Sequence, residues 1–92
     1  MYVVLVYDIS QEDGGTKVLS QVFKICKKYL HHIQNSVFEG EMSDSQIFSL
    51  KAELSTRIRK EFDSVIIFKS RDQKWMEKSF WGKTTDDTSF MI

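Results

Sequence analysis

The stretch HHIQNSVFEGE, residues 31–41, decides between the folds that this chain can adopt. It alternates like a β-strand, but the polar pair Asn35 and Ser36 interrupts it where a buried sheet has little room for polar side chains. If the chain bends at this pair, the segment forms two short strands. If it does not, the segment forms one strand, and the sheet is smaller by one. The pattern alone leaves both arrangements open.

Two other segments are predicted to be buried strands. Residues 2–7, YVVLVY, are apolar and mostly β-branched or aromatic, without polar alternation. Such a run is typical of a central strand that is covered on one face and flanked on both sides. Residues 63–68, DSVIIF, repeat the β-branched character and predict a second buried strand.

Two amphipathic helices separate these strands. The glycines of ISQEDGG free the backbone before a helix that starts near Thr16. Its buried stripe consists of Val18, Val22, Ile25, Cys26 and Tyr29, whereas Ile33 lies past its end. The second helix begins with a capping box of Ser43 and Gln46, with Met42 and Ile47 at the staple positions. The stripe of this helix is Ile47, Leu50, Leu54 and Ile58.

The order of elements predicts an α+β fold. With two strands in 31–41 it is a ferredoxin-like βαββαβ sandwich, and with one strand it is a smaller βαβαβ unit. We expect one domain over residues 1–68 and a tail over 69–92, which closes on the strand-like SFMI. A chain of 92 residues buries a small core, so a partner subunit would supplement it.

Composition narrows the function. The 13 basic and 13 acidic residues cancel, which argues against a general polybasic field for nucleic acid. Between Lys17 and Phe38, however, the sequence holds four lysines and no acid, which predicts a local basic face. The lone Cys26 rules out an internal disulfide and indicates a small buried hydrophobe, so we expect a cytoplasmic protein. We see no targeting or membrane-spanning segment.

Asp8 is the candidate catalytic and metal-binding residue, because it ends the first strand. A carboxylate there can bind Mg²⁺, but one carboxylate is a poor site for an ion that prefers octahedral oxygen coordination. A two-fold dimer would supply Asp8 twice, and the pair could hold Mg²⁺ that activates water against a phosphodiester. The alternative is that Asp8 caps the turn through hydrogen bonds to the following amides.

Several motifs together resemble a known family. These are MYVVLVYDIS, a helix ending in KKYL, IQNSVFEGE, a capped helix and DSVIIF, which span roughly residues 1–68. They are similar to the small CRISPR-associated adaptation subunit that bridges the integrase during spacer acquisition in antiviral defence. The combination of YDIS with QNSVFEGE is specific. The family fold is ferredoxin-like, which implies two strands in 31–41. Some relatives are metal-dependent nucleases on RNA or duplex DNA, and others are dimeric adaptors that hold DNA between integrase dimers.

The resemblance also assigns residues. Asp8 matches the metal-binding aspartate of the family, and three further residues match the frame around the site: Tyr7, Ser36 and Phe38. Relatives often place arginines, which grip phosphates bidentately, where this chain has Gly15, Lys17 and His32. Lys17 and a protonated His32 would contribute point charges only. This argues against strong nuclease activity.

Other candidates are weighed against simpler explanations. A zinc site at His31 and His32 is disfavoured, because successive residues point to different sides and no cysteine or acid lies at ligand spacing. The lysine face of the first helix, Lys17, Lys24 and Lys28 beside His31, is either an ordinary solvated face or a set of contacts to duplex phosphates. Trp75 and Trp81 favour packing in the tail or a dimer interface over base stacking.

Three functions therefore remain open. The first is a homodimeric adaptor of CRISPR adaptation that binds duplex DNA through Lys17, Lys24, Lys28 and His32 and docks the integrase through its C-terminal portion. The second is a Mg²⁺-dependent endonuclease on single-stranded RNA or duplex DNA, which uses paired Asp8. The third is a small-molecule regulatory domain, which rests on fold analogy alone.

Overall fold

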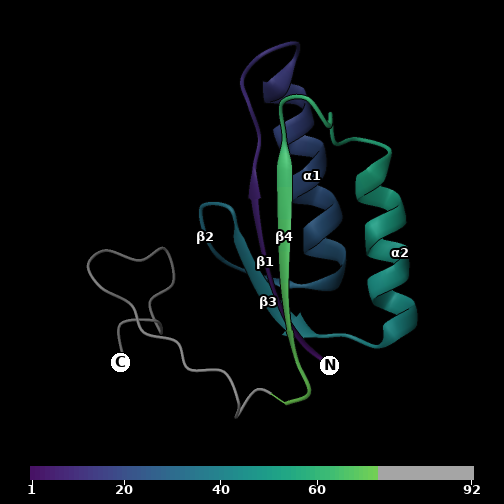
Figure 1. The fold of residues 1–92 in the computed structure, drawn as a ribbon. Helices are drawn as coiled ribbons and strands as arrows, with labels where there is room; N and C mark the ends of the chain where they lie inside the picture. The colour runs from purple at the N-terminus through teal and green to yellow at the C-terminus, as the bar shows by residue number, and fades with distance from the viewer. Residues whose placement is uncertain (73–92) are drawn as a thin grey trace.

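The computed structural model describes residues 1–72 of the chain. Its elements are β1 Tyr2–Asp8, α1 Gly15–Tyr29, β2 His31–Gln34, β3 Val37–Glu41, α2 Asp44–Ser55 and β4 Ser64–Ser70. The four strands form one sheet, and both helices cover the same face of it (Figure 1). This two-layer βαββαβ arrangement confirms the predicted ferredoxin-like α+β fold.

The sheet has the strand order β2-β3-β1-β4, and every neighbouring pair is antiparallel. β1 therefore lies in the interior of the sheet, as its uninterrupted apolar run predicts. The end of β1 lies beside the beginnings of two strands, because Val6 pairs with Val37 of β3 and Asp8 pairs with Ser64 of β4. This register places Asp8 at one end of the sheet.

Asn35 and Ser36 form the turn between β2 and β3, so residues 31–41 are two strands. Asn35 has a φ of 42°, in the left-handed region that asparagine enters more readily than most residues. Two contacts hold the turn. The Nε2 atom of His32 hydrogen-bonds to the carbonyl oxygen of Asn35 at 2.8 Å, and the backbone amide of Tyr7 donates to the carbonyl of Ser36 at 3.1 Å. The turn is thus attached to the end of β1.

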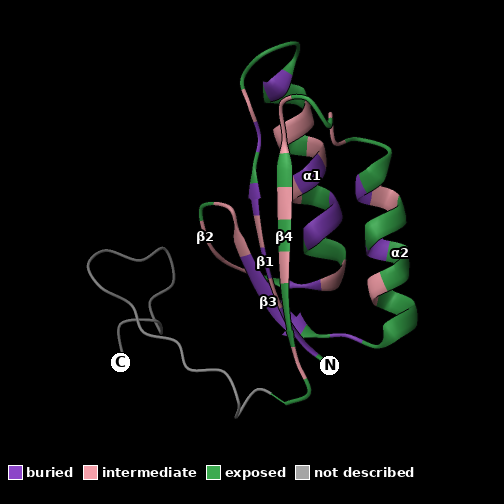
Figure 2. Ribbon diagram, in the orientation of Figure 1, coloured by how far each residue is buried: buried purple, intermediate pink, exposed green. Residues whose placement is uncertain are grey.

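The core lies between the sheet and the helices, where Figure 2 shows the buried segments of α1 and β3. The largest fully buried side chains include Phe38, Leu5 and Leu50. Cys26 is also fully buried with a free thiol, as predicted, and burial raises the pKa of this thiol to about 12. Ile33 lies in β2, past the end of α1.

Most element ends agree with the predictions to within two residues, but the predicted extension of the second helix to Ile58 is wrong: α2 ends at Ser55, and Ile58 packs against the core from the segment that follows it. The capping box of α2 is present, because the Ser43 hydroxyl accepts from the Gln46 amide and the Ser43 amide donates to the Gln46 side chain. α1 begins at Gly15, and β4 continues to Ser70 instead of ending at residue 68. Such small shifts at element ends are usual.

Several predictions about the tail fall outside the described residues. They concern Trp75, Trp81, the strand-like SFMI and the docking of the integrase by the C-terminal portion, and they stay predictions, as does the division at residue 68. Within residues 1–72, no helix is long and apolar enough to cross a membrane.

Candidate metal and nucleic-acid site

The end of the sheet that carries Asp8 is the centre of the candidate site. Asp8 is the last residue of β1, and its side chain is exposed. Within residues 1–72 this side chain takes part in no hydrogen bond or ion pair. The predicted turn cap is therefore not formed: the amide of Ser10 donates to Asp63 at 3.0 Å instead. Asp8 is left available for a ligand.

Aromatic rings support this end of the sheet from the helix side. Phe38 is fully buried, and its ring centroid lies 6.0 Å from that of Tyr7 and 5.4 Å from that of Phe23. The His32 ring packs against both phenylalanines, with centroid distances of 4.9 Å to each. The structure thus brings together the predicted frame of Tyr7, Ser36 and Phe38. It adds Phe23, which the sequence pattern did not single out, and it places the predicted phosphate contact His32 in the same frame.

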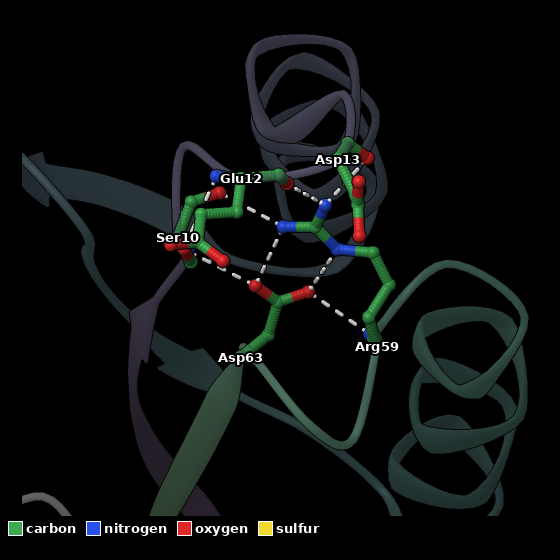
Figure 3. Close-up of polar contacts among 5 residues, drawn as sticks. All are labelled: Ser10, Glu12, Asp13, Arg59 and Asp63. Atoms are coloured by element: carbon green, nitrogen blue, oxygen red, sulfur yellow. Dashed lines mark hydrogen bonds and ion pairs between the residues drawn. The ribbon is translucent and has the colours of Figure 1, made fainter.

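Arg59 and Asp63 clamp the loop that follows Asp8 (Figure 3). The guanidinium Nε donates to Asp63 Oδ2 at 2.9 Å, and one Nη donates to Asp63 Oδ1 at 2.9 Å and to the carbonyl of Ser10 at 2.8 Å. The other Nη donates to the carbonyl of Asp13 at 2.7 Å and to that of Glu12. One side chain therefore holds three carbonyls of a single loop.

Both oxygens of the Asp63 carboxylate accept hydrogen bonds in the clamp, and the Arg59 guanidinium balances its charge. The Asp63 side chain has none of its surface exposed, and it also accepts from the backbone amides of Ser10 and Arg59. The hydrogen bonds from the Arg59 guanidinium hold the pKa of Asp63 far below its usual range, and the same pairing raises the pKa of Arg59. Both backbone groups of Ser10, two residues after Asp8, are thereby fixed.

The lysine face forms one stripe on α1. Spacings of seven and four residues place Lys17, Lys24 and Lys28 on the same side of the helix, and all three are exposed. Lys28 makes an ion pair with Glu53 of α2, which also accepts a hydrogen bond from the hydroxyl of Tyr29. These hydrogen bonds raise the pKa of Lys28 and lower that of Glu53. The sequence between Lys17 and Phe38 contains no acid, but the fold places Glu53 of α2 beside this basic face.

The face of the sheet opposite the helices is apolar where β1 pairs with β4. Val3 and Leu5 point into the core, so the alternating residues Val4 and Val6 face the other side. Their partners across β4 are Phe68 and Ile66, which are 55% and 53% exposed. Figure 2 shows β4 as largely exposed or intermediate. Large apolar side chains at this exposure mark a surface that suits association.

Comparison with known proteins decides the family. The family described as CRISPR associated protein Cas2 matches residues 1–78. A relative from Fusobacterium nucleatum, named CRISPR-associated endoribonuclease Cas2, is 57% identical over 88 residues, covering 96% of this chain and 83% of the relative. The chain belongs to the Cas2 family. A solved Cas2 structure has a TM-score of 0.83 at 32% identity, covering 100% of this chain and 98% of that one. Cas2 of Streptococcus pyogenes has a TM-score of 0.75 at 28% identity, covering 88% and 100%.

Membership in the Cas2 family confirms the resemblance, and a regulatory small-molecule domain gains no support. The structure also gives a steric reason for one departure from the arginine pattern. A Cβ atom at Gly15 would lie 1.8 Å from the carbonyl oxygen of Ser10, so the clamped loop leaves no room for a side chain there. The Gly15 position cannot carry a phosphate-gripping arginine unless the loop moves.

The Mg²⁺ hypothesis depends on a second Cas2 protomer. Asp8 offers the hard oxygen ligands that Mg²⁺ prefers. Within residues 1–72, however, no group of three or more His, Cys, Asp or Glu side chains lies together in a metal-binding cluster. One protomer therefore brings a single carboxylate to the site, and a two-fold partner would add the second.

Proposed function

We propose that this Cas2 family member is a homodimeric adaptor of CRISPR adaptation, which acts in the cytoplasm and holds duplex DNA for the integrase. The observation that carries the proposal is the exposed stripe of Lys17, Lys24 and Lys28 on α1. Lysines are point charges that suit phosphates and read no bases. His32, when protonated, is a fourth proposed contact, and the integrase docks through the C-terminal portion.

The homodimer forms through the apolar sheet face. The partly exposed Ile66 and Phe68 and the neighbouring Val4 and Val6 would be covered by the same face of a second copy. The strand-like SFMI of the tail would add to the edge of the partner's sheet. Light scattering at micromolar concentration should show a dimer. A monomeric wild type would contradict this arrangement. In the Phe68→Asp variant, the equilibrium should shift from dimer toward monomer.

Salt dependence of duplex binding tests the adaptor. Each phosphate that a lysine neutralises releases counterions, so affinity should fall steeply with salt and be the same for two duplexes of unrelated sequence. Replacing Lys17, Lys24 and Lys28 together by Gln should flatten the slope of log affinity against log salt by about 0.9 for each lost contact in each protomer.

A matched control removes the same charge elsewhere. Lys51, Lys60 and Lys69 line a groove between α2 and β4, away from the lysine stripe. Their replacement by Gln should leave the slope unchanged. Equal slopes in both triple variants would make the stripe an ordinary solvated face. Copurification with an integrase subunit should survive both triple substitutions, because we place docking in the tail.

A second candidate is a Mg²⁺-dependent endonuclease acting on single-stranded RNA or duplex DNA. It is favoured by the exposed Asp8 carboxylate, which has no partner within residues 1–72. Relatives are named endoribonucleases. A bound Mg²⁺ would supply an activated water molecule. The residues of this chain would contribute the two Asp8 carboxylates of a dimer, which the clamp at Ser10 and the pairing with Ser64 hold in place.

A further inference from the structure

A cleft lies between α1 and the C-terminal end of α2. It has a volume of about 460 Å³, and its walls include Lys24 and Lys28 of α1, Glu53 of α2 and Arg57, which follows α2. Gln21 and Thr56 also line it. Residues from α1 and from the end of α2 thus converge on one concave surface, and two lysines of the stripe, Lys24 and Lys28, line it.

The charge of this cleft is unbalanced. It contains three cations and one acid, and that acid, Glu53, is paired with Lys28. Lys24 and Arg57 have no ion-pair partner among residues 1–72. Gln21 adds a neutral hydrogen-bond donor, whereas the Thr56 hydroxyl already donates to the carbonyl of Glu53 at 2.7 Å. A cleft with surplus positive charge and several donors suits an anion with several oxygen atoms.

We propose that this cleft binds a phosphate group of the duplex backbone, with Arg57 as its bidentate contact and Glu53 as the group that phosphate displaces from Lys28. The identity of the ligand rests on the proposed duplex binding. Arg57 supplies the planar guanidinium fork that Lys17 and His32 lack. Lys28 is 56% exposed, and an ion pair between exposed groups is weak in water, so a phosphate can take the place of the carboxylate.

Matched single variants test the charges of the cleft. Arg57→Gln should flatten the salt slope of duplex binding by about 0.9 per protomer. Lys51→Gln removes the same charge from α2, but Lys51 lines the groove toward β4, and its slope should equal that of the wild type. Arg57→Lys should lose affinity while keeping the slope, because it retains the charge and loses the fork.

Glu53 provides a test of opposite sign. Glu53→Gln should strengthen duplex binding about threefold, because it removes a negative charge beside the phosphate and releases Lys28. Glu61→Gln removes the same charge from an exposed residue outside the cleft and should leave affinity unchanged. A solvated helix surface without a phosphate site would give equal results for these two variants, and that result would overturn the proposal.

Titration with inorganic phosphate distinguishes a failure of the cleft proposal from a failure of the proposed adaptor function. In titrations followed by NMR, the backbone amides of Gln21, Thr56 and Arg57 should shift saturably in the wild type and much less in Arg57→Gln. If phosphate binds there but no duplex binds, the anion site stands and the adaptor function fails. If duplex binds with the same salt slope in Arg57→Gln and Lys51→Gln, and phosphate causes no saturable shift, the adaptor stands and the cleft proposal is wrong.

Discussion

Two aspartates, Asp8 and Asp63, lie near the same end of the sheet and differ in burial and in hydrogen bonding. Asp63 is fully covered, and both of its oxygens accept hydrogen bonds from Arg59 and from backbone amides. Asp8 is exposed and has no side-chain partner within residues 1–72. The carboxylate that is satisfied by the protein holds the loop together. The carboxylate without a protein partner within residues 1–72 is the one that we propose as the metal ligand.

The same contrast separates two ion pairs: Arg59–Asp63, whose residues are four apart in the sequence, and Lys28–Glu53, which joins α1 to α2. In the clamp, the side chains of Arg59 and Asp63 are 18% and 0% exposed, whereas those of Lys28 and Glu53 are 56% and 34% exposed. A covered and fully hydrogen-bonded pair is costly to break, because one partner would remain buried without its counter-charge. An exposed pair exchanges easily with other ions. The first is a structural connection, and the second is available for binding.

The largest effect is expected at Asp8 and concerns activity alone. If the protein cleaves nucleic acid, Asp8→Asn should abolish Mg²⁺-dependent turnover, because it removes charge from the metal site with little change of shape. The urea midpoint should stay within error of the wild type. Cleavage that survives this substitution, or that persists in chelator, would refute the paired-carboxylate mechanism.

Asp63 should show the opposite behaviour. Asp63→Ala leaves the Arg59 guanidinium without its counter-charge and the Ser10 amide without an acceptor, so we expect the free energy of unfolding to fall by about 3 kcal/mol. Urea denaturation followed by circular dichroism measures this. Glu53→Gln, which breaks the exposed pair, is the matched control and should barely move the urea midpoint. Equal effects of the two substitutions would remove the distinction between the two ion pairs.

A smaller effect is expected at two adjacent glycines beside the clamp. Gly15→Ala places a Cβ atom 1.8 Å from the Ser10 carbonyl and should destabilise by about 2 kcal/mol, because the clamped loop has to shift. Gly14→Ala meets no atom within 4 Å, but its φ of 78° makes any side chain unfavourable by about 1 kcal/mol. Thermal unfolding of both variants would test this order, and the reverse order would show that the loop yields.

The fold was predictable because its signals are local. Apolar runs predicted the strands β1 and β4, and the capping box of Ser43 and Gln46 predicted the start of α2. The prediction that the second of these strands is buried is wrong, because β4 lies at the end of the strand order and none of its residues is buried. The two strands in 31–41 could not be settled from the pattern, because the bend depends on contacts with another strand. The amide of Tyr7 binds the Ser36 carbonyl, and Val6 pairs with Val37. Only the resemblance to a family pointed to the correct alternative.

The candidate site was predictable only in part, for the same reason. Asp8 was visible because it ends an apolar run. The clamp was not, because Arg59 and Asp63 contact a loop that is far away in the sequence, and their only local signal is an arginine and an aspartate four residues apart. The pairing of Glu53 with Lys28 was also not predicted, because Glu53 lies on α2, 25 residues away in the sequence. The absence of acids from a sequence segment does not exclude acids that a second helix brings next to it.

The smallest effect concerns acid pH and separates the charge of Asp63 from its shape. Because the Arg59 pairing holds the pKa of Asp63 well below the value of the unfolded chain, the unfolded state takes up this proton first as the pH falls. The stabilisation is fully present above about pH 5 and is lost progressively at lower pH. Asp63→Asn cannot take up this proton, so its stability should fall less steeply between about pH 5 and pH 3, with roughly one proton fewer linked to unfolding. Lys51→Gln keeps Asp63 and should follow the wild-type curve. Parallel curves for the wild type and Asp63→Asn would show that the clamp depends on the shape of residue 63 and not on its charge.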